Sequence, residues 1–344
     1  MDERIKILEL FGGIGAPKMA LVNMGKEHKS IDYVEIQANR VRAYNAMFER
    51  LYKPESVVGY NLMADILIHG SPCQDFSRAR LRYGRSGGEG ERSSLLYETL
   101  RIIREAGMWR PRVVVWENVA GVLDKDMRCA FADYLEELEE MGYTNSFEVI
   151  SAMEHGVPQK RERLFTVSML GGMKFDFSKV KKRETPHIKE FLVPESEVGE
   201  QHIINIPSML NKIPEHYKQT NKSYTRMLDV IDTHCWTITE RQDRCPNAGV
   251  IKMSDGRYRY LTEREVWRLM GFSDDYFDAV LKEFPTKQGK RNATLYAMAG
   301  NSIVVPILED LFAAILYNTH EKGESQRIEG MCDVDDQTNI FDFM

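Results

Sequence analysis

Apolar runs and helix-like patterns alternate along the first half of the chain. Strands are predicted at residues 5–11, 31–36, 65–69, 113–119, 146–153 and 164–169. Between residues 127 and 141, apolar residues recur at spacings of three and four, which is typical of an amphipathic helix. Further helices are expected directly after the first strand and at residues 39–52, 93–106, 262–270 and 306–317. This order predicts an α/β fold, with a mostly parallel, Rossmann-like sheet and helices on both faces.

The alternation ends near residue 170. Residues 171–255 are polar and rich in proline, which breaks regular elements and favours loops. We therefore expect a second, smaller and irregular domain to follow the sheet.

Residues that could bind a ligand or take part in a reaction lie at the ends of the predicted strands. Residues 11–16, Phe-Gly-Gly-Ile-Gly-Ala, join the first strand to its helix, and glycines let a backbone turn sharply and approach a ligand. Glu35 ends the second strand, where a carboxylate can accept hydrogen bonds from ribose hydroxyls. Cys73 follows the third strand, and Glu117 closes the fourth. Ligands of such sheets bind outside the carboxyl ends of the strands, so these features are expected to line one crevice.

Residues 70–74, Gly-Ser-Pro-Cys-Gln, predict a nucleophile. A cysteine that follows a proline at the end of a buried strand is held stiffly, and its thiolate is a strong nucleophile. Glu117 would supply a carboxyl group to the same crevice, which suits attack on an electron-poor ring. The alternative for Cys73 is the buried, unreactive state that is usual for a free cysteine.

Residues 159–163, Gln-Lys-Arg-Glu-Arg, form a second polar motif. On an extended backbone, Gln159, Arg161 and Arg163 share one face. Two guanidinium groups on that face could hold a base oxygen and a phosphate. The alternative is a basic strand edge that is exposed to solvent.

Composition narrows the class of protein further. The 344 residues are 43% hydrophobic and 28% charged, as in an ordinary globular protein. The net charge of −6 counts mildly against nucleic-acid binding, although arginines gather between residues 78 and 85. The five cysteines include no C-x-x-C pair, so we expect no metal and a reducing, cytoplasmic compartment. Neither a signal peptide nor a membrane-spanning run is expected.

The order of the motifs resembles the cytosine-5 DNA methyltransferase family. The matching segments span nearly the whole chain and comprise residues 11–16, Glu35, residues 72–74, residues 117–119, residues 159–163, residues 261–272 and residues 300–302. Pro-Cys-Gln, followed by Glu-Asn-Val and then Gln-x-Arg-x-Arg, is highly specific for that family. The resemblance implies the methyltransferase version of the Rossmann-like sheet, with S-adenosyl-L-methionine as cofactor.

The resemblance also assigns roles to individual residues. Cys73 would attack carbon 6 of cytosine, while Glu117 hydrogen-bonds N3, and carbon 5 would then take the methyl group. Arg163 would hold the base oxygen, with Arg161 supporting the site. The implied cofactor pocket consists of Phe11, Gly13, Gly15, Glu35, Ile36, Pro72, Leu95, Asn301 and, in place of the usual adenine-binding aspartate, Asn61.

A substrate and a domain plan follow from the same resemblance. The substrate would be double-stranded DNA whose target cytosine is flipped out of the stack. Residues 75–92 resemble the family's mobile catalytic loop, and residues 171–292 would form the target-recognition domain. The catalytic domain would comprise residues 1–170 and 293–344, because the last helix packs back on it. We expect a monomer, with a cognate restriction endonuclease as a partner that catalysis does not require.

Three alternatives stay open at this point. A tRNA cytosine-5 methyltransferase of the same family would use the same chemistry, although a substantial recognition region favours DNA. A catalytically silent DNA-binding relative would be expected to lack the cysteine or the glutamate, and both are present. A NAD-dependent oxidoreductase would explain the glycine run and Glu35, but neither Pro-Cys-Gln nor Glu-Asn-Val.

Overall fold

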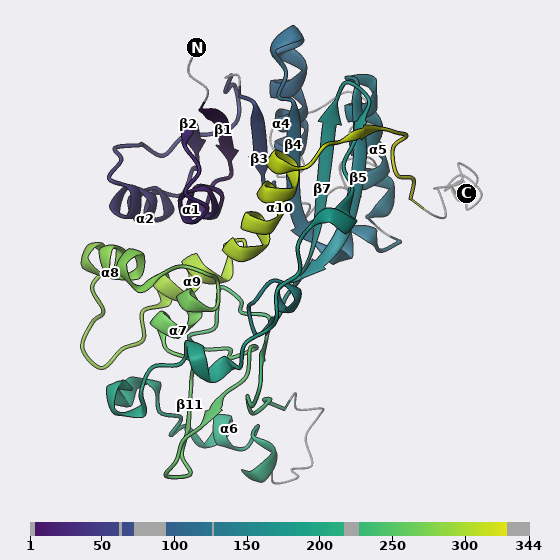
Figure 1. Cartoon of the computed structure of the whole chain (residues 1–344). Helices are drawn as coiled ribbons and strands as arrows, with labels where there is room; N and C mark the ends of the chain where they lie inside the picture. The colour runs from purple at the N-terminus through teal and green to yellow at the C-terminus, as the bar shows by residue number, and fades with distance from the viewer. Residues whose placement is uncertain (1–3, 62–63, 72–93, 126, 217–226, 329–344) are drawn as a thin grey trace, which may run out of the picture.

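The centre of the molecule is a six-stranded sheet with the strand order β2-β1-β3-β4-β7-β5 (Figure 1). The computed structural model describes residues 4–61, 64–71, 94–125, 127–216 and 227–328. The strands are β1 (Ile5–Leu10), β2 (His28–Val34), β3 (Ile66–His69), β4 (Val113–Val119), β5 (Tyr143–Ser151) and β7 (Glu162–Leu170). β1 to β4 run parallel, and β7 is antiparallel to both of its neighbours. The predicted, mostly parallel α/β sheet is confirmed, with β7 reversed.

Helices cover both faces of this sheet (Figure 1). The first face carries α1 (Ala16–Asn23), α2 (Ala38–Phe48) and α10 (Val305–Tyr317), and the second carries α4 (Ser94–Glu105) and α5 (Arg128–Glu140). Successive strand residues point to opposite faces. Val113 and Val115 therefore pack with the first group of helices, and Val114 and Trp116 with the second. Burying a side chain of this size contributes roughly 1.5–3 kcal/mol, so two apolar layers hold β4 in place.

Beyond the sheet, regular elements are short in the described residues between 171 and 262. They include β8 (Met173–Lys174), β9 (Cys235–Trp236), β10 (Ile251–Lys252), β11 (Tyr258–Arg259) and α6 (Pro207–Leu210). β6 (Gln159–Lys160) pairs in parallel with β9 and so connects this region to the strand that leads into β7. A small buried cluster that includes Val250 and Tyr258 is the local core. The loop-rich structure expected here is confirmed.

Helical structure returns with α7 (Glu263–Arg268), which has a capping box. The Thr262 hydroxyl accepts a hydrogen bond from the Glu265 backbone N–H, and the Glu265 carboxylate accepts one from the Thr262 N–H. Two further helices, α8 (Asp274–Glu283) and α9 (Ala293–Gly300), were not predicted from the sequence. Trp267 belongs to the same apolar core as β1 and α10, so these helices are joined to the sheet.

Within the described residues, one helical stretch, Ala293–Tyr317, is apolar and long enough to span a membrane. It contains both α9 and α10, and 67% of its most apolar window is buried inside the protein. Packing between α10 and α1 accounts for this apolar character, because the side chains form the core on the first face of the sheet.

The C-terminal segment covers the outer edge of β5. β12 (Glu321–Lys322) pairs with β8, and the Gln326 N–H then donates to the Asn145 carbonyl at 2.8 Å. The Phe147 N–H donates to the Gln326 side chain at 3.0 Å. Unpaired strand edges invite association with other chains, so this segment protects an edge of the sheet.

Candidate active site

Glu117 and Arg163 lie side by side at the carboxyl end of β4. In the antiparallel pairing of β4 with β7, Glu117 stands opposite Phe165 and Arg163 opposite Val119. The Arg163 Nε is 3.3 Å from the Glu117 Oε1, and the two side chains are 17% and 13% exposed. The ion pair is therefore mostly buried but not closed to solvent.

Burial determines the acidity of Glu117. Loss of water raises the pKa of its carboxyl group, and the positive charges of Arg163 and Arg161 oppose this rise without cancelling it. A carboxyl group with a raised pKa keeps its proton to higher pH and can donate it to a ring nitrogen. The environment therefore suits Glu117 to hydrogen-bond a heterocyclic base.

The segment that leads to Cys73 is attached to the same strand end. The Asn118 amide donates to the Ser71 carbonyl at 3.0 Å, while its oxygen accepts from the Val119 N–H at 2.8 Å. A Cβ placed on Gly70 would lie 3.9 Å from the Glu117 Oε2. The ends of β3 and β4 are thus fixed to each other beside the Glu117 carboxyl group. Cys73 itself, like Pro72, lies outside the described residues.

The buried side chain of His69 fixes the end of β3, a role that the sequence did not predict. The ring is 1% exposed, and its nitrogens lie 3.2 Å from the Ser71 Oγ and 3.0 Å from the Tyr134 hydroxyl. It also stacks on Trp116. Burial lowers the pKa of His69 to about 3, so the ring stays neutral. The only signal in the sequence was a polar residue within an apolar strand.

The structure separates Arg161 from Arg163. Arg161 is 3% exposed, and its guanidinium donates to the carbonyls of Ile238, Gly300 and Ser302. Gln159 is buried as well, with its amide bridging the Ile238 N–H and the Leu269 carbonyl. The interpretation of two free guanidiniums on one face is therefore wrong, and so is the alternative of an exposed basic edge.

Burial also affects the charge of Arg161. Loss of water, followed by repulsion from Arg163, lowers the pKa of its guanidinium to about 9. Its hydrogen bonds all go to backbone carbonyls that are remote in sequence, so it braces the region around the site. Arg163 is the basic residue of this motif that reaches the Glu117 carboxylate in the described structure.

The glycine run after β1 lies on a layer of tyrosines. A Cβ on Gly12 would come within 2.5 Å of the Tyr33 ring, and one on Gly15 within 2.6 Å of the Tyr44 ring. The Tyr33 hydroxyl donates to the Gly13 carbonyl at 2.5 Å, which fixes the loop from below. Gly13 differs, because nothing lies within 4 Å of a Cβ placed there. Gly13 thus marks the open side of the turn.

Backbone strain accompanies this turn. Phe11 has a φ of 55°, which is uncommon for a residue with a side chain, and Gly13 and Gly15 have φ values of 57° and 83°. Strained backbone of this kind is typically held in place at ligand-binding sites.

Glu35 reaches back to the glycine run. Its carboxylate accepts hydrogen bonds from the N–H groups of Gly13 at 3.1 Å and Gln37 at 2.8 Å, and it lies 3.3 Å from the Arg40 guanidinium. The next residue, Ile36, is 67% exposed, which is unusual for a large apolar side chain beside a buried carboxylate. The glycine run, the Glu35 carboxylate and the exposed side chain of Ile36 are therefore brought together.

The remaining predicted cofactor residues are more dispersed. Asn61 is exposed, and Leu95 packs against the core between the sheet and α4. Asn301 caps the C-terminus of α9, and its amide donates to the Ala297 carbonyl and the Glu240 carboxylate. Both partners of the Asn301 amide belong to other parts of the protein than the glycine run and Glu35, so its cofactor role stays a prediction.

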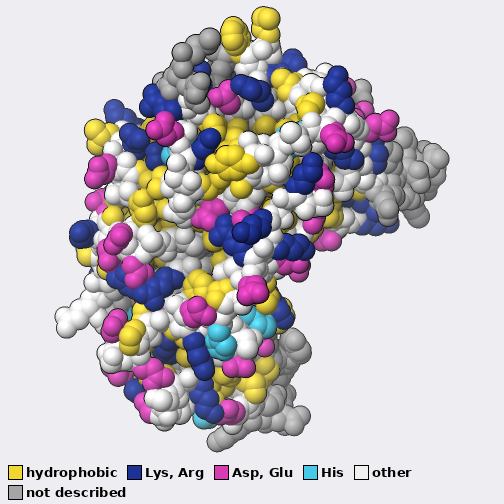
Figure 2. Space-filling model, in the orientation of Figure 1, with side chains coloured by type: hydrophobic (Ala, Val, Ile, Leu, Met, Phe, Trp, Pro, Cys, Tyr) yellow, Lys and Arg dark blue, Asp and Glu magenta, His cyan; other side chains and the backbone are white. Residues whose placement is uncertain are grey.

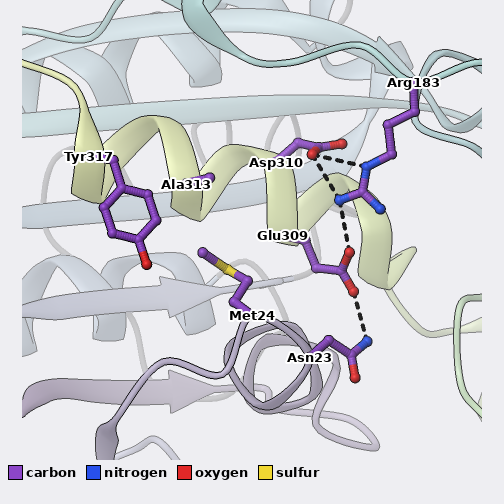
Figure 3. A pocket seen from close by; sticks show the side chains of 7 residues that line it. All are labelled: Asn23, Met24, Arg183, Glu309, Asp310, Ala313 and Tyr317. Carbon is purple, nitrogen blue, oxygen red and sulfur yellow. Dashed lines mark hydrogen bonds and ion pairs between the residues drawn. The ribbon is translucent and has the colours of Figure 1, made fainter.

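A cavity of about 340 Å³ lies between α1 and α10, and none of the predicted site residues lines it (Figure 3). Arg183 points into it and binds the carboxylates of Glu309 and Asp310, each at 2.8 Å. Asn23 of α1 donates to Glu309, and His155 lies 2.9 Å from Asp310. These groups satisfy one another, so the network joins structural elements rather than marking a second site.

Charge on the surface is mixed in this view. Figure 2 shows Lys and Arg side chains interspersed with Asp and Glu over the sheet and over the region below it. This distribution agrees with the modest net charge of −6.

Comparison with known proteins agrees with the geometry. The family model described as C-5 cytosine-specific DNA methylase matches residues 5–317. Type II methyltransferase M2.ScrFI of Lactococcus lactis subsp. cremoris is 26% identical, over 90% of this chain and 98% of its own length. Type II methyltransferase M.HhaI of Haemophilus parahaemolyticus is 27% identical, over 89% of this chain and 92% of that protein. A match of this extent excludes the oxidoreductase alternative.

A solved structure shares the fold. The crystal structure of S. pombe Dnmt2 methyltransferase is 22% identical, covers 91% of this chain and 98% of that chain, and superposes with a TM-score of 0.70. The likeness extends over the sheet and the region beyond it, so the two proteins share one fold over most of this chain. With Glu117 and Arg163 paired at the strand ends and the family model matched over residues 5–317, the chain belongs to the C-5 cytosine-specific DNA methylase family and is a DNA cytosine-5 methyltransferase.

Proposed function

We propose that this enzyme methylates a cytosine flipped out of double-stranded DNA, through a transient covalent bond between Cys73 and carbon 6. The observation that carries the proposal is the buried Glu117 carboxyl group beside Arg163. Asn118 attaches this group to the segment from which the chain continues to Cys73. A nucleophile and an acid held at one place are what addition to an electron-poor ring requires.

Catalysis proceeds by addition to the ring, methyl transfer and elimination. The Cys73 thiolate forms a bond to carbon 6, and electron density moves through the ring while Glu117 hydrogen-bonds N3. Carbon 5 would then accept the methyl group that bound S-adenosyl-L-methionine supplies, and the cofactor would leave as the neutral thioether. A base removes the proton from carbon 5, and the electron pair that is released expels Cys73 as thiolate. Arg163, freed from Glu117 by the incoming base, holds the base oxygen.

Arg161 has a different role in this scheme. Its guanidinium is bonded to three carbonyls and is buried, so it does not touch the base. It holds the strand that carries Arg163 in register with the residues around Ile238 and Ser302. We therefore assign it as a positioning residue.

The glycine run and Glu35 fit S-adenosyl-L-methionine, the methyl donor that this family uses. When bound, the cofactor supplies a methyl group activated by positive charge on sulfur. The open side of Gly13 admits close approach, and Glu35 can accept from ribose hydroxyls. Ile36 offers an exposed apolar surface for a flat base. Gly15, Phe11, Leu95, Asn61, Pro72 and Asn301 complete the proposed pocket.

We further propose that residues 171–292 recognise the target sequence, and that residues 1–170 and 293–344 form the catalytic domain. The named relatives are type II methyltransferases, which supports a role in restriction-modification beside a cognate endonuclease. A monomer acting on DNA in the cytoplasm fits this role. Phage protection and regulation are alternatives to restriction-modification as the biological role, and the enzyme would catalyse the same reaction in each.

The experiment measures transfer of tritiated methyl groups to plasmid DNA and, separately, to total RNA. Wild-type protein should label DNA only, Cys73→Ala should label neither, and both should bind the cofactor equally. A duplex with 5-fluorocytosine at the target should then trap the protein covalently, because fluorine takes the place of the carbon 5 proton and cannot be removed by a base, so Cys73 is not released. Labelling of RNA alone would replace the DNA substrate, and full turnover by Cys73→Ala would exclude the covalent route.

A further inference from the structure

Trp236 is a partly exposed tryptophan in a rigid setting. Two of the four tryptophans, Trp116 and Trp267, are buried, whereas Trp236 is 46% exposed. It lies on β9, and the Nζ of Lys160 on the paired strand β6 is 4.6 Å from the centre of its ring. An aromatic face and an ammonium group are thus held together at the surface.

The frame beneath this pair is fixed by hydrogen bonds. The backbone N–H of Trp236 donates to the Ala248 carbonyl at 3.1 Å, and the Thr237 hydroxyl donates to the Lys160 carbonyl at 2.7 Å. Gln159 and Arg161, on either side of Lys160, are buried and hold both backbone groups of Ile238. The backbone that carries the ring is therefore fixed before a ligand binds, which lowers the entropy cost of ordering it.

The pair is close to the catalytic carboxyl group along the chain. Lys160 precedes Arg163 by three residues, and an extended chain of that length reaches at most about 10 Å. Arg163 contacts Glu117. The pair therefore lies near the end of β4, where the nucleotides that flank a base held at Glu117 would pass. Aromatic rings stack on bases of any sequence, and ammonium groups bind phosphates.

We propose that Trp236 and Lys160 contact the nucleotide next to the target cytosine, with the ring packing on its base or sugar and the ammonium group on its phosphate. This inference rests on the proposed DNA substrate. Flipping the target leaves its neighbours partly unstacked, so a fixed aromatic surface stabilises the flipped state. The contact does not distinguish bases by hydrogen bonding, so it contributes affinity more than sequence preference.

The test measures DNA binding by Trp236→Ala, Trp236→Phe and Lys160→Ala, with a duplex carrying the motif that the wild-type enzyme methylates. The matched control is Trp109→Ala, because Trp109 is 68% exposed and precedes the amino end of β4, whereas Glu117 is near its carboxyl end. Trp236→Ala should weaken binding about ten- to hundredfold, and Trp236→Phe should stay within about threefold of wild type. Lys160→Ala should lower the slope of log affinity against log salt by about 1.

Fluorescence separates a contact from a structural role. In Trp109→Phe, DNA should quench the remaining emission, and in Trp236→Phe this quenching should disappear while binding persists. Unchanged affinity of Trp236→Ala, or quenching retained in Trp236→Phe, would overturn the inference, as would a parallel loss of thermal stability and cofactor binding. The wild type is assayed for methylation in the same preparation. Failure there would count against the proposed function, whereas a methylating wild type isolates failure of this contact.

Discussion

The Arg163 guanidinium lies 3.3 Å from the Glu117 carboxylate, and this contact couples the two polar side chains that lie at the end of β4. Burial has already raised the pKa of Glu117, and the positive charge of Arg163 limits that rise. An incoming base that draws Arg163 away would therefore favour the protonated carboxyl group. The hydrogen-bond donor for N3 would then form when the substrate binds.

Glu117→Gln should slow methyl transfer by roughly 10²- to 10⁴-fold, the usual contribution of a general acid. An amide cannot give up a proton to N3 as charge develops. Single-turnover kinetics with saturating DNA measure the change, and denaturant unfolding checks that the fold is intact. Glu162→Gln is the control, since Glu162 is exposed on the neighbouring strand. Equal loss in both variants would contradict a specific role for Glu117.

Arg161 and Arg163 should fail in different ways. Arg161→Met leaves three buried carbonyls without a donor and should cost about 3 kcal/mol of unfolding free energy. Arg163→Met should cost less stability than Arg161→Met, because the raised pKa of Glu117 lets its carboxyl group take up a proton when the partner is lost. It should nevertheless abolish turnover, because its partner is the proposed catalytic carboxylate. Urea unfolding and methyl-transfer assays on both variants give the comparison. A stable but inactive Arg161→Met would place Arg161 at the substrate instead.

Gly13 and Gly15 separate cofactor binding from folding. Gly13→Ala adds a methyl group to open space at a φ of 57°, so it should cost about 1 kcal/mol of stability and yet weaken cofactor binding strongly. Gly15→Ala meets Tyr44 at 2.6 Å and should destabilise the fold by more than Gly13→Ala. Calorimetric titration with S-adenosylmethionine and thermal unfolding measure the two effects. Unchanged cofactor affinity in Gly13→Ala would place the cofactor elsewhere.

The buried ring of His69 should make the fold sensitive to acid. Its pKa is lowered to about 3, so below pH 6.5 the unfolded chain binds a proton that the folded chain does not. The contribution of neutral His69 to the free energy of unfolding is complete above pH 6.5. It decreases by about 1.4 kcal/mol per pH unit as the pH falls toward 3. His69→Gln should remove this part of the slope of unfolding free energy against pH. The exposed His216→Gln serves as control and should leave the slope unchanged.

Much of the fold was predictable, because local pattern determines it. Val113–Val119 is an apolar strand that packs against helices on both faces, and the structure has the bounds that the sequence predicted. The reversal of β7 was not predicted, although the short connection between β5 and β7 in the sequence requires it. Only residues 152–161 separate β5 from β7, which is too short for the crossover that parallel neighbours need.

The candidate site was predictable only in part. Glu35 follows β2 and Glu117 lies near the carboxyl end of β4, and those positions alone pointed to a common crevice. The bracing role of Arg161 depends on carbonyls that lie 77 to 141 residues away in sequence, and the position of His69 depends on Tyr134, 65 residues away. Periodicity reports the burial of an element and does not report such distant partners.

The most direct test is bisulfite sequencing of plasmid and genomic DNA from a host without cytosine methylation that expresses the enzyme. The account predicts 5-methylcytosine within one short motif for the wild type, none for Cys73→Ala, and a much smaller modified fraction for Glu117→Gln. Unmodified DNA from cells that contain soluble, cofactor-binding wild-type protein would contradict it.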